Sequence, residues 1–333
     1  MRGEAYSSVT IAPMAEQRDR PVVAVVGSLN IDLVAYTQRV PSAGETVIGD
    51  RFEMGFGGKG ANQAVMAARL GARVAMIGAL GDDVYAGMTL ENLASQGIDA
   101  TQVTRVAGSS GVAPIWVEPD GTNRIIVIPG ANDQVDPDAA AAAIRSMDRL
   151  DVVICQLEIP QRVTLAAFRA ARDRGAVTIL NPAPAAPLTP DLVAASDWLI
   201  PNETEFAILA GVDLLDPDDD GAVLAYAQRV SPRVVVTVGA RGAAIVGSDG
   251  RVELFPATPV PSVDTTGAGD AFVGAFAVGL AADLDERAAV RLAIACASDS
   301  VTRHGTQSSF ASRERATEFL QEIRAEADDV APA

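Results

Sequence analysis

Residues 264–276, DTTGAGDAFVGAF, place a loop of small residues directly before a strongly apolar stretch. Gly267, Ala268 and Gly269 have no side chain that would keep a phosphate away from their backbone N–H groups. Free N–H groups at the start of a helix, together with the helix dipole, form a site for an anion. Asp270 then stands in the first helical turn, where it could cap the helix or act as a general base. Because phosphoryl transfer needs positioning, charge neutralisation and a group that orients the acceptor hydroxyl, the segment favours the base.

A second glycine-rich segment supplies possible ligand donors. Residues 55–60, GFGGKG, match the spacing of a dinucleotide fingerprint, but they do not follow the first expected strand directly, so we reject that interpretation. We expect residues 57–63, GGKGANQ, to bring the backbone close to a small polar ligand at a helix start, with Lys59 and Asn62 as donors. The P-loop and protein-kinase motifs are absent from the sequence, so a kinase would need another framework.

The elements that must position these segments follow an alternating pattern. The expected strands are Val22–Val26, Arg73–Ile77, Asp151–Cys155, Val177–Leu180, Asp197–Ile200 and Arg233–Val238. The expected helices between them include Ala61–Leu70, Val84–Gln96, Arg162–Arg174 and Ala222–Val230. Continuous apolar strands that alternate with helices predict an α/β fold with a parallel sheet covered on both faces.

Polar segments follow five of the expected strands. They are GSLNID at 27–32, QLE at 156–158, NPAPA at 181–185, PNETE at 201–205 and GARG at 239–242. Parallel sheets bind ligands beyond the carboxyl ends of their strands, so these segments predict a ligand cleft at that edge.

Two segments, 31–56 and 111–128, break the rhythm because apolar and polar residues alternate in them around turn signals. PDGTN in the second segment predicts a hairpin. We expect antiparallel ribbons that form a flap or a dimer surface. Their apolar faces, with Val34, Ile115 and Trp116, would need cover, which favours a homodimer formed through these lid segments.

Composition limits the other classes of function. The chain has 333 residues, 49% of them hydrophobic and 21% charged, and a net charge of −17, which is typical of a globular protein without the basic face that nucleic acids require. No apolar stretch is long enough to span a membrane, and residues 1–20 lack the pattern of a signal peptide, so we expect a cytoplasmic protein. Residues 1–20 are interpreted as a disordered leader, and residues 323–333 as a mobile acidic tail.

In chain order, GSLNID, GGKGANQA, NPAPA, PNETE, TVGARG and DTTGAGDAF resemble the ribokinase family of carbohydrate kinases over about residues 21–322. GANDQV at 130–135 and VTRHGTQ at 301–307 resemble the ribokinase branch of that family. The resemblance implies a three-layer α/β/α sandwich with a mostly parallel central sheet and a small β-sheet lid. It also implies phosphorylation of D-ribose at the 5-hydroxyl by ATP, with Mg²⁺ and with K⁺ or a similar monovalent cation.

Residue by residue, the resemblance implies five groups of site residues. The sugar contacts would be Asn30, Asp32, Gly58, Lys59, Asn62, Glu158 and Asp270, with Asp270 as the base. The anion hole would be the N–H groups of Gly267, Ala268, Gly269 and Asp270. The nucleotide side would comprise Asn202, Thr237, Gly239, Arg241, Gly242 and Gly269, and the magnesium and phosphate motif would comprise Asn202 and Glu205. The monovalent cation would take oxygens from Asp264, Thr266, Ser300, Arg303, Gly305 and Ser309.

Two alternatives stay open on the sequence alone. The same chemistry could act on another acceptor, such as deoxyribose, fructose or adenosine. A sugar-binding regulator without catalysis is the other alternative, and the intact Asp270 and GAG loop count against it. The single histidine, His304, falls in the expected cation loop, where we expect it to form hydrogen bonds and not to act as a catalyst.

Overall fold

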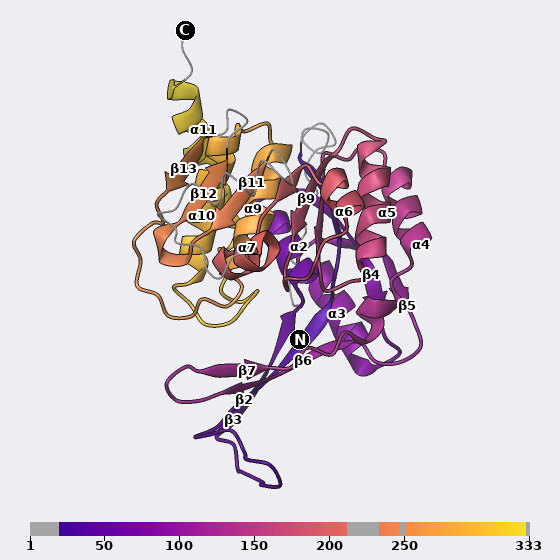
Figure 1. Cartoon of the computed structure of the whole chain (residues 1–333), viewed down its shortest axis with the longest axis vertical. Helices are drawn as coiled ribbons and strands as arrows, with labels where there is room; N and C mark the ends of the chain where they lie inside the picture. Colours follow the sequence, from indigo (N-terminus) through magenta and orange to yellow (C-terminus); the bar gives the residue numbers. More distant parts are fainter. Residues whose placement is uncertain (1–19, 212–232, 247–250, 331–333) are drawn as a thin grey trace, which may run out of the picture.

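The computed structural model describes residues 20–211, 233–246 and 251–330 (Figure 1). The expected helix at 222–230 and all but the last residue of the expected leader lie outside these residues. Within them, the predicted fold class is confirmed, because helices pack on both faces of a large, mostly parallel sheet.

The central sheet has nine strands in the order β13-β12-β11-β10-β9-β8-β1-β4-β5. Its parallel strands are β1 (Val22–Val26), β4 (Arg73–Leu80), β5 (Asp99–Arg105), β8 (Val152–Gln156), β9 (Val177–Asn181), β10 (Trp198–Leu199) and β11 (Val234–Thr237). Two antiparallel strands, β12 (Ala243–Val246) and β13 (Val252–Phe255), extend one edge. All six expected strands are present, while β5, β12 and β13 were not predicted.

The core lies in two layers, one on each face of the sheet. Along β1, Val23 and Val25 belong to one buried cluster, and Ala24 and Val26 belong to the other. Helices α2 (Lys59–Arg69), α3 (Val84–Ser95), α9 (Ala268–Ala281), α10 (Glu286–Ser300) and α11 (Arg313–Val330) cover the first face. Helices α4 (Pro137–Ser146), α5 (Gln161–Arg172), α6 (Pro190–Ala195) and α7 (Glu203–Ala210) cover the second. Two short 3₁₀ helices, η1 (Gly130–Gln134) and η2 (Gly239–Arg241), complete the described elements.

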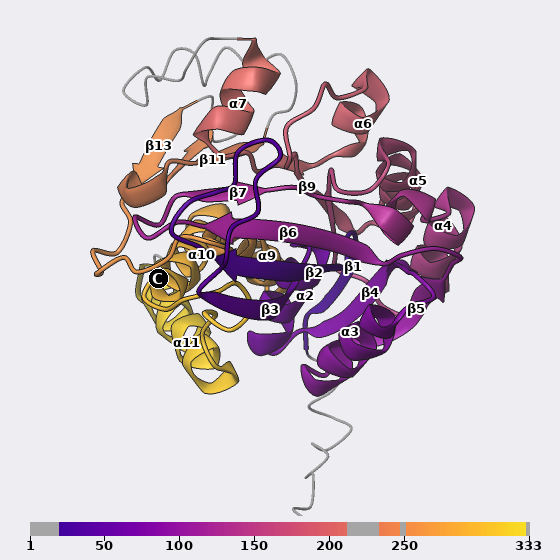
Figure 2. The ribbon, with the colours of Figure 1, turned by 90° about the horizontal axis from the view of Figure 1, so that it is seen from below.

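The lid is a separate sheet of four strands that projects from the carboxyl edge of the sandwich (Figures 1 and 2). Its order is β3 (Arg51–Gly57), β2 (Asn30–Tyr36), β6 (Gly111–Val117) and β7 (Asn123–Ile125). The outer pairs are antiparallel, as predicted, but β2 and β6 pair in parallel. Both strands leave the sandwich at the same edge of the sheet, which gives them one direction, and their pairing joins the two predicted antiparallel ribbons into one lid.

The C-terminal segment also differs from the expectation. Helix α11 continues to Val330, into the stretch from 323 that was interpreted as a mobile tail. The Ile323 side chain is buried in the first core layer, so its apolar contacts hold this turn of the helix against the domain. Among the described residues, no helix is long and apolar enough to cross a bilayer.

Candidate active site

Asp270 lies in the first turn of α9, whose N-cap is Gly267 with a positive φ of 79°. A side chain at Gly267 would place its Cβ 2.7 Å from Cγ2 of Thr306, so glycine is required for both conformation and space. A Cβ on Gly269 would meet nothing within 4 Å, so this backbone faces open space. The Ala268 N–H already donates to the Thr265 carbonyl, which leaves the neighbouring amides of the turn as the better candidates for an anion hole.

The Asp270 carboxylate is buried, and two side-chain amides from α2 hold it. Nδ2 of Asn62 donates to Oδ2 of Asp270 at 2.9 Å, and Nε2 of Gln63 donates to Oδ1 at 2.9 Å. Hydrogen bonds from amide N–H groups to a carboxylate fix the positions of both its oxygens. Asn62 was predicted as a sugar contact, and the structure shows that its side chain also fixes the predicted base.

Each of these amides is held by further amides. Oε1 of Gln63 accepts from Nε2 of Gln156 at 2.6 Å, and Nε2 of Gln63 also donates to Oδ1 of Asn181 at 3.1 Å. On the other side, Oδ1 of Asn62 accepts from Nε2 of Gln307 at 3.0 Å. The ends of β8 and β9 and the loop after α10 therefore converge on one carboxylate.

The other predicted sugar-side charges gather around Lys59 at the start of α2. Burial raises the pKa of Asp32 to about 7, and the nearby carboxylates of Glu158 and Asp270 add to the rise. Burial lowers the pKa of Lys59, but the surrounding carboxylates Asp270, Glu158 and Glu205 more than offset this, so its net pKa is raised and the ammonium stays charged. Three of the acids thus surround one cation, and Asp32 lies near two of these three.

The glycines of the 57–60 loop serve close backbone packing. A Cβ on Gly58 would lie 2.7 Å from the backbone nitrogen of Asn30, and one on Gly60 would lie 2.6 Å from that of Ser28. A Cβ on Gly57 would lie 2.3 Å from Oδ1 of Asp32. The loop therefore approaches the chain's own first strand end, which places Asp32 beside the start of α2.

Glu158 and Asn30 are fixed by this arrangement. Oε2 of Glu158 accepts from the Lys59 N–H at 3.0 Å and from the Ser28 hydroxyl. Oδ1 of Asn30 accepts from Nδ2 of Asn132 at 2.7 Å, and Asn132 in turn accepts from the backbone N–H of Leu29. Asn132 belongs to the GANDQV segment, so that motif orients a predicted sugar contact.

A cavity of about 510 Å³ adjoins the start of α9, and Asn62 is not among the residues that line it. The predicted nucleotide-side residues that line it are Asn202, Thr237, Gly239, Gly242 and Gly269. Arg241 does not line it and instead forms an ion pair with Glu203. The loop of residues 257–262 and the side chains of Phe272 and Val301 add an apolar wall that the sequence analysis missed.

Asn202 and Glu205 form a capping box at the start of α7. Oδ1 of Asn202 accepts from the Glu205 N–H at 2.8 Å, and Oε2 of Glu205 accepts from the Asn202 N–H at 2.9 Å. Burial raises the pKa of Glu205, hydrogen bonding and Lys59 oppose the rise, and Asp270 adds to it. Glu205 thus keeps a carboxylate near the site in addition to its structural role.

The two halves of the predicted cation loop lie together. The carboxylate of Asp264 accepts from the N–H groups of Thr266 and Gly305, both at 2.9 Å. Although burial opposes the shift, these hydrogen bonds and nearby His304 lower the pKa of Asp264, so it is anionic near neutral pH. His304 itself is exposed, with Nδ1 4.0 Å from Oδ2 of Asp264.

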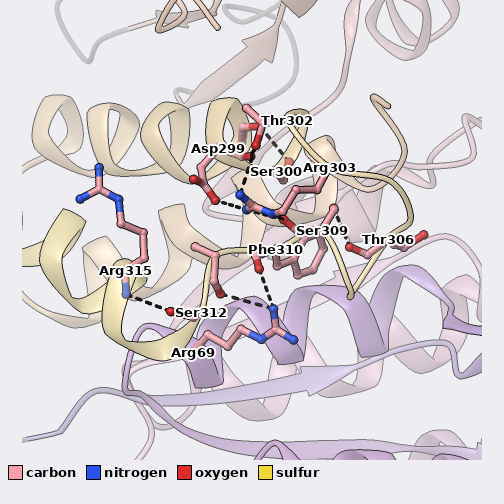
Figure 3. Close-up of polar contacts among 12 residues, drawn as sticks. Arg69, Asp299, Ser300, Thr302, Arg303, Thr306, Ser309, Phe310, Ser312 and Arg315 are labelled. Atoms are coloured by element: carbon pink, nitrogen blue, oxygen red, sulfur yellow. Dashed lines mark hydrogen bonds and ion pairs between the residues drawn. The ribbon is translucent and has the colours of Figure 1, made fainter. Parts of the chain in front are cut away.

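One predicted cation ligand is occupied by a side chain of the protein. The Ser309 carbonyl oxygen accepts from Nε and Nη2 of Arg303 at 2.9 and 2.6 Å, and Arg303 also pairs with Asp299 (Figure 3). Ser300 donates its hydroxyl to the carbonyl of Ala297. A cation bound by Ser309 would therefore require the Arg303 guanidinium to leave this carbonyl.

Sequence reasoning missed the residues that position the predicted ones. Gln63, Asn132, Asn181 and Gln307 all lie within segments already noted, but no role was assigned to them. The signal available was the recurrence of amide side chains in those segments. Their pairing depends on how α2, the strand ends and the loop after α10 meet in three dimensions.

The chain is similar to known carbohydrate kinases over most of its length. The model of the pfkB family of carbohydrate kinases matches residues 21–313. A deoxyribokinase of Salmonella typhi is 40% identical over 301 residues, which cover 90% of this chain and 98% of the relative. A ribokinase of Bacillus subtilis is 40% identical over 300 residues, which cover 90% of this chain and 99% of the relative. The solved structure of Arabidopsis thaliana ribokinase complexed with ribose and ATP is similar with a TM-score of 0.83 at 30% identity, covering 91% of this chain and 99% of that one.

Proposed function

The chain belongs to the pfkB family of carbohydrate kinases, and we propose that it transfers the γ-phosphoryl group of ATP to the 5-hydroxyl of D-ribose. One observation carries the proposal: adjacent residues at the start of α9 face two different sites. Gly269 lines the 510 Å³ cavity, whereas Asp270 is held by Asn62 of the glycine-rich loop. A phosphoryl group transferred between two such sites would pass across the N-terminus of α9.

In this proposal, the sugar hydroxyls are bound by Asn30, Asp32, Asn62 and Glu158, with Lys59 and the Gly58 backbone beside them. Fixed carboxylates and amides suit a polyol because each hydroxyl group can both donate and accept a hydrogen bond. Asp270 orients the 5-hydroxyl and accepts its proton late in the reaction, because a loose transition state requires alignment more than a strong base. The amides of Gly267 to Asp270 would stabilise the charge that develops on the phosphoryl oxygens.

ATP would occupy the 510 Å³ cavity. There the backbone of Thr237, Gly239 and Gly242 could approach the nucleotide, and Phe272 and Val301 would form an apolar wall. The exposed Arg241 would reach the nucleotide only after release from Glu203. Mg²⁺, when bound, neutralises charge on the transferred group, and the Glu205 carboxylate near Asn202 is an oxygen donor of the type that Mg²⁺ prefers. We place K⁺ or a similar cation at Asp264 and Thr266 and the carbonyl groups of 300–309.

A second acceptor, 2-deoxyribose, is a specific candidate because a relative named deoxyribokinase is 40% identical over most of both chains. The two sugars differ by one hydroxyl group, so discrimination rests on whether a buried polar group here needs that hydroxyl as partner. We further propose that the protein acts as a homodimer through the outer lid, where Phe52, Ile125 and Ile126 are exposed.

The test is an ADP-release assay with ATP, Mg²⁺ and K⁺ on ribose, 2-deoxyribose, fructose, adenosine and a blank without acceptor. We expect kcat/KM for ribose to exceed that for every other acceptor. A higher value for 2-deoxyribose would overturn the ribose assignment and keep the chemistry. Asp270→Asn should lower turnover by about three orders of magnitude or more while sugar affinity and folding persist, and full turnover by this variant would refute the role of Asp270.

A further inference from the structure

The direction of every amide around Asp270 follows from the carboxylate itself. An ionised carboxylate only accepts hydrogen bonds, so the side of the Gln63 amide that faces Asp270 must be the nitrogen. Oε1 of Gln63 then faces Gln156, which must present its own nitrogen there. Nδ2 of Asn181 donates to the Ile200 carbonyl at 2.8 Å, so its oxygen is left to face Gln63. The chain of amides therefore has one consistent polarity that ends at Asp270.

The far end of this chain supports the same polarity. Oε1 of Gln156 is buried and has no hydrogen-bond partner among the described residues. Turning the Gln156 amide alone would place its oxygen against Oε1 of Gln63, and turning both glutamines would satisfy this oxygen only by aiming Oε1 of Gln63 at the Asp270 carboxylate. An unpaired buried carbonyl costs free energy, and the fold accepts this cost at Gln156 in the orientation that lets Gln63 donate to Asp270.

We propose that Gln63 is a positioning residue for phosphoryl transfer, which holds the Asp270 carboxylate in its productive orientation through a hydrogen bond whose direction Gln156 and Asn181 fix. This inference rests on the proposed role of Asp270 as base. Gln63 is itself fully buried and lies on α2, so it acts through Asp270 and does not take part in binding the sugar.

The physical reason is the freedom of a carboxylate to rotate about its Cβ–Cγ bond. Asn62 fixes Oδ2 of Asp270, and without Gln63 the other oxygen would have no side-chain donor from α2. A base that transfers a proton at a fixed distance loses rate when its orientation spreads over several states. A side-chain amide is neutral at every pH near 7, so Gln63 fixes Asp270 without competing for the proton.

The test compares Gln63→Met with Gln156→Met. Both glutamines are fully buried and neighbours in the same hydrogen-bonded chain, and methionine preserves their length, so the two variants should lose similar stability. Only Gln63 contacts Asp270. The measurements are kcat and sugar KM at saturating ATP, equilibrium sugar binding, and the thermal unfolding midpoint, with Asp270→Asn as reference.

We expect Gln63→Met to lower kcat by roughly 10- to 100-fold, the range of one hydrogen bond to a charged group, with sugar KM changed less than about threefold. We expect Gln156→Met to lower kcat by a smaller factor, at most about threefold, because Asn181 still orients the Gln63 amide and the contact of Gln63 with Asp270 remains. Equal losses of kcat in the two variants, or a Gln63→Met enzyme as active as the parent, would overturn the inference. If Gln63→Met does not fold, Gln63→Asn shortens the same contact by one methylene group and must show the same kcat loss. An inactive Asp270→Asn beside an unaffected Gln63 variant would refute this inference alone, whereas an active Asp270→Asn would refute the proposed base.

Discussion

Replacement of Asp32 by asparagine should change how stability depends on pH, with a sign that the structure fixes. Burial and the neighbouring carboxylates Glu158 and Asp270 raise the pKa of Asp32 from 3.8 to about 7. The folded state therefore binds a proton that the unfolded state has released between these two values. Folded-state stability from this group is present below about pH 4 and is lost as the pH rises to 7.

The magnitude follows from the two pKa values. With 3.8 in the unfolded chain and about 7 in the folded protein, protonation of Asp32 stabilises the fold by about 3 kcal/mol at pH 5 and by almost nothing at pH 8. The parent should thus lose about 2 to 3 kcal/mol from this group between pH 5 and pH 8. Asp32→Asn carries no titrating group there and should lose nothing from this position.

The assay is urea unfolding of the sugar-free protein at pH 5, 6, 7 and 8, for the parent, Asp32→Asn and Asp264→Asn. Asp264 is the matched control, because hydrogen bonds lower its pKa and its stabilisation is lost only as the pH falls below the ordinary carboxyl range. The free energy of unfolding of Asp264→Asn should change with pH in parallel with that of the parent from pH 5 to 8. The free energy of unfolding of Asp32→Asn should approach or exceed that of the parent toward pH 8. Parallel curves for the parent and Asp32→Asn would refute the buried acid cluster as the cause of the shift.

Two further predictions concern the anion hole and the cation. Gly267→Ala should lower kcat at least about tenfold with little change in equilibrium sugar binding. The added Cβ would lie 2.7 Å from Cγ2 of Thr306 at a positive φ of 79°, so it would displace the start of α9. An unchanged kcat in steady-state kinetics would contradict this prediction. Replacing K⁺ with a bulky organic cation should reduce turnover while calorimetric ADP binding persists, and an enzyme indifferent to this exchange would exclude a cation at Asp264 and the 300–309 loop.

The central strands could be predicted because both of their faces are buried. In β1, all five residues are valine or alanine, so a continuous apolar run marked the strand to its observed bounds at Val22–Val26. The edge strand β5, DATQVTR, is mostly exposed and has no such run, so composition could not mark it. The parallel pairing of β2 with β6 was hidden for another reason, since local alternation gives the faces of a strand and not the direction of its distant partner.

In the candidate site, too, some residues could be predicted from the sequence and others could not. Charged residues and glycine loops stand out in a sequence because burial of a charge and close backbone approach each require particular residue types, as at Asp270 and Gly58. The amides that orient them do not stand out. Gln63 and Gln156 are 93 positions apart, and their contact exists only because α2 packs across the end of β8. The spacing of residues along the chain therefore could not predict this contact.

The acid cluster and the amide chains have opposite effects on one site. Glu158, Glu205 and Asp270 surround the single ammonium of Lys59, and Asp32 lies near Glu158 and Asp270. The repulsion among these carboxylates weakens the sugar-free fold above neutral pH. Amides add no charge, so Gln63 can fix Asp270 without adding to that repulsion. A polyol would bring hydroxyl donors to the carboxylates that the protein leaves short of them, and its binding would relieve part of the cost. In the proposed function, the same charges that destabilise the sugar-free protein would thus add to its affinity for a neutral, hydroxyl-rich ligand.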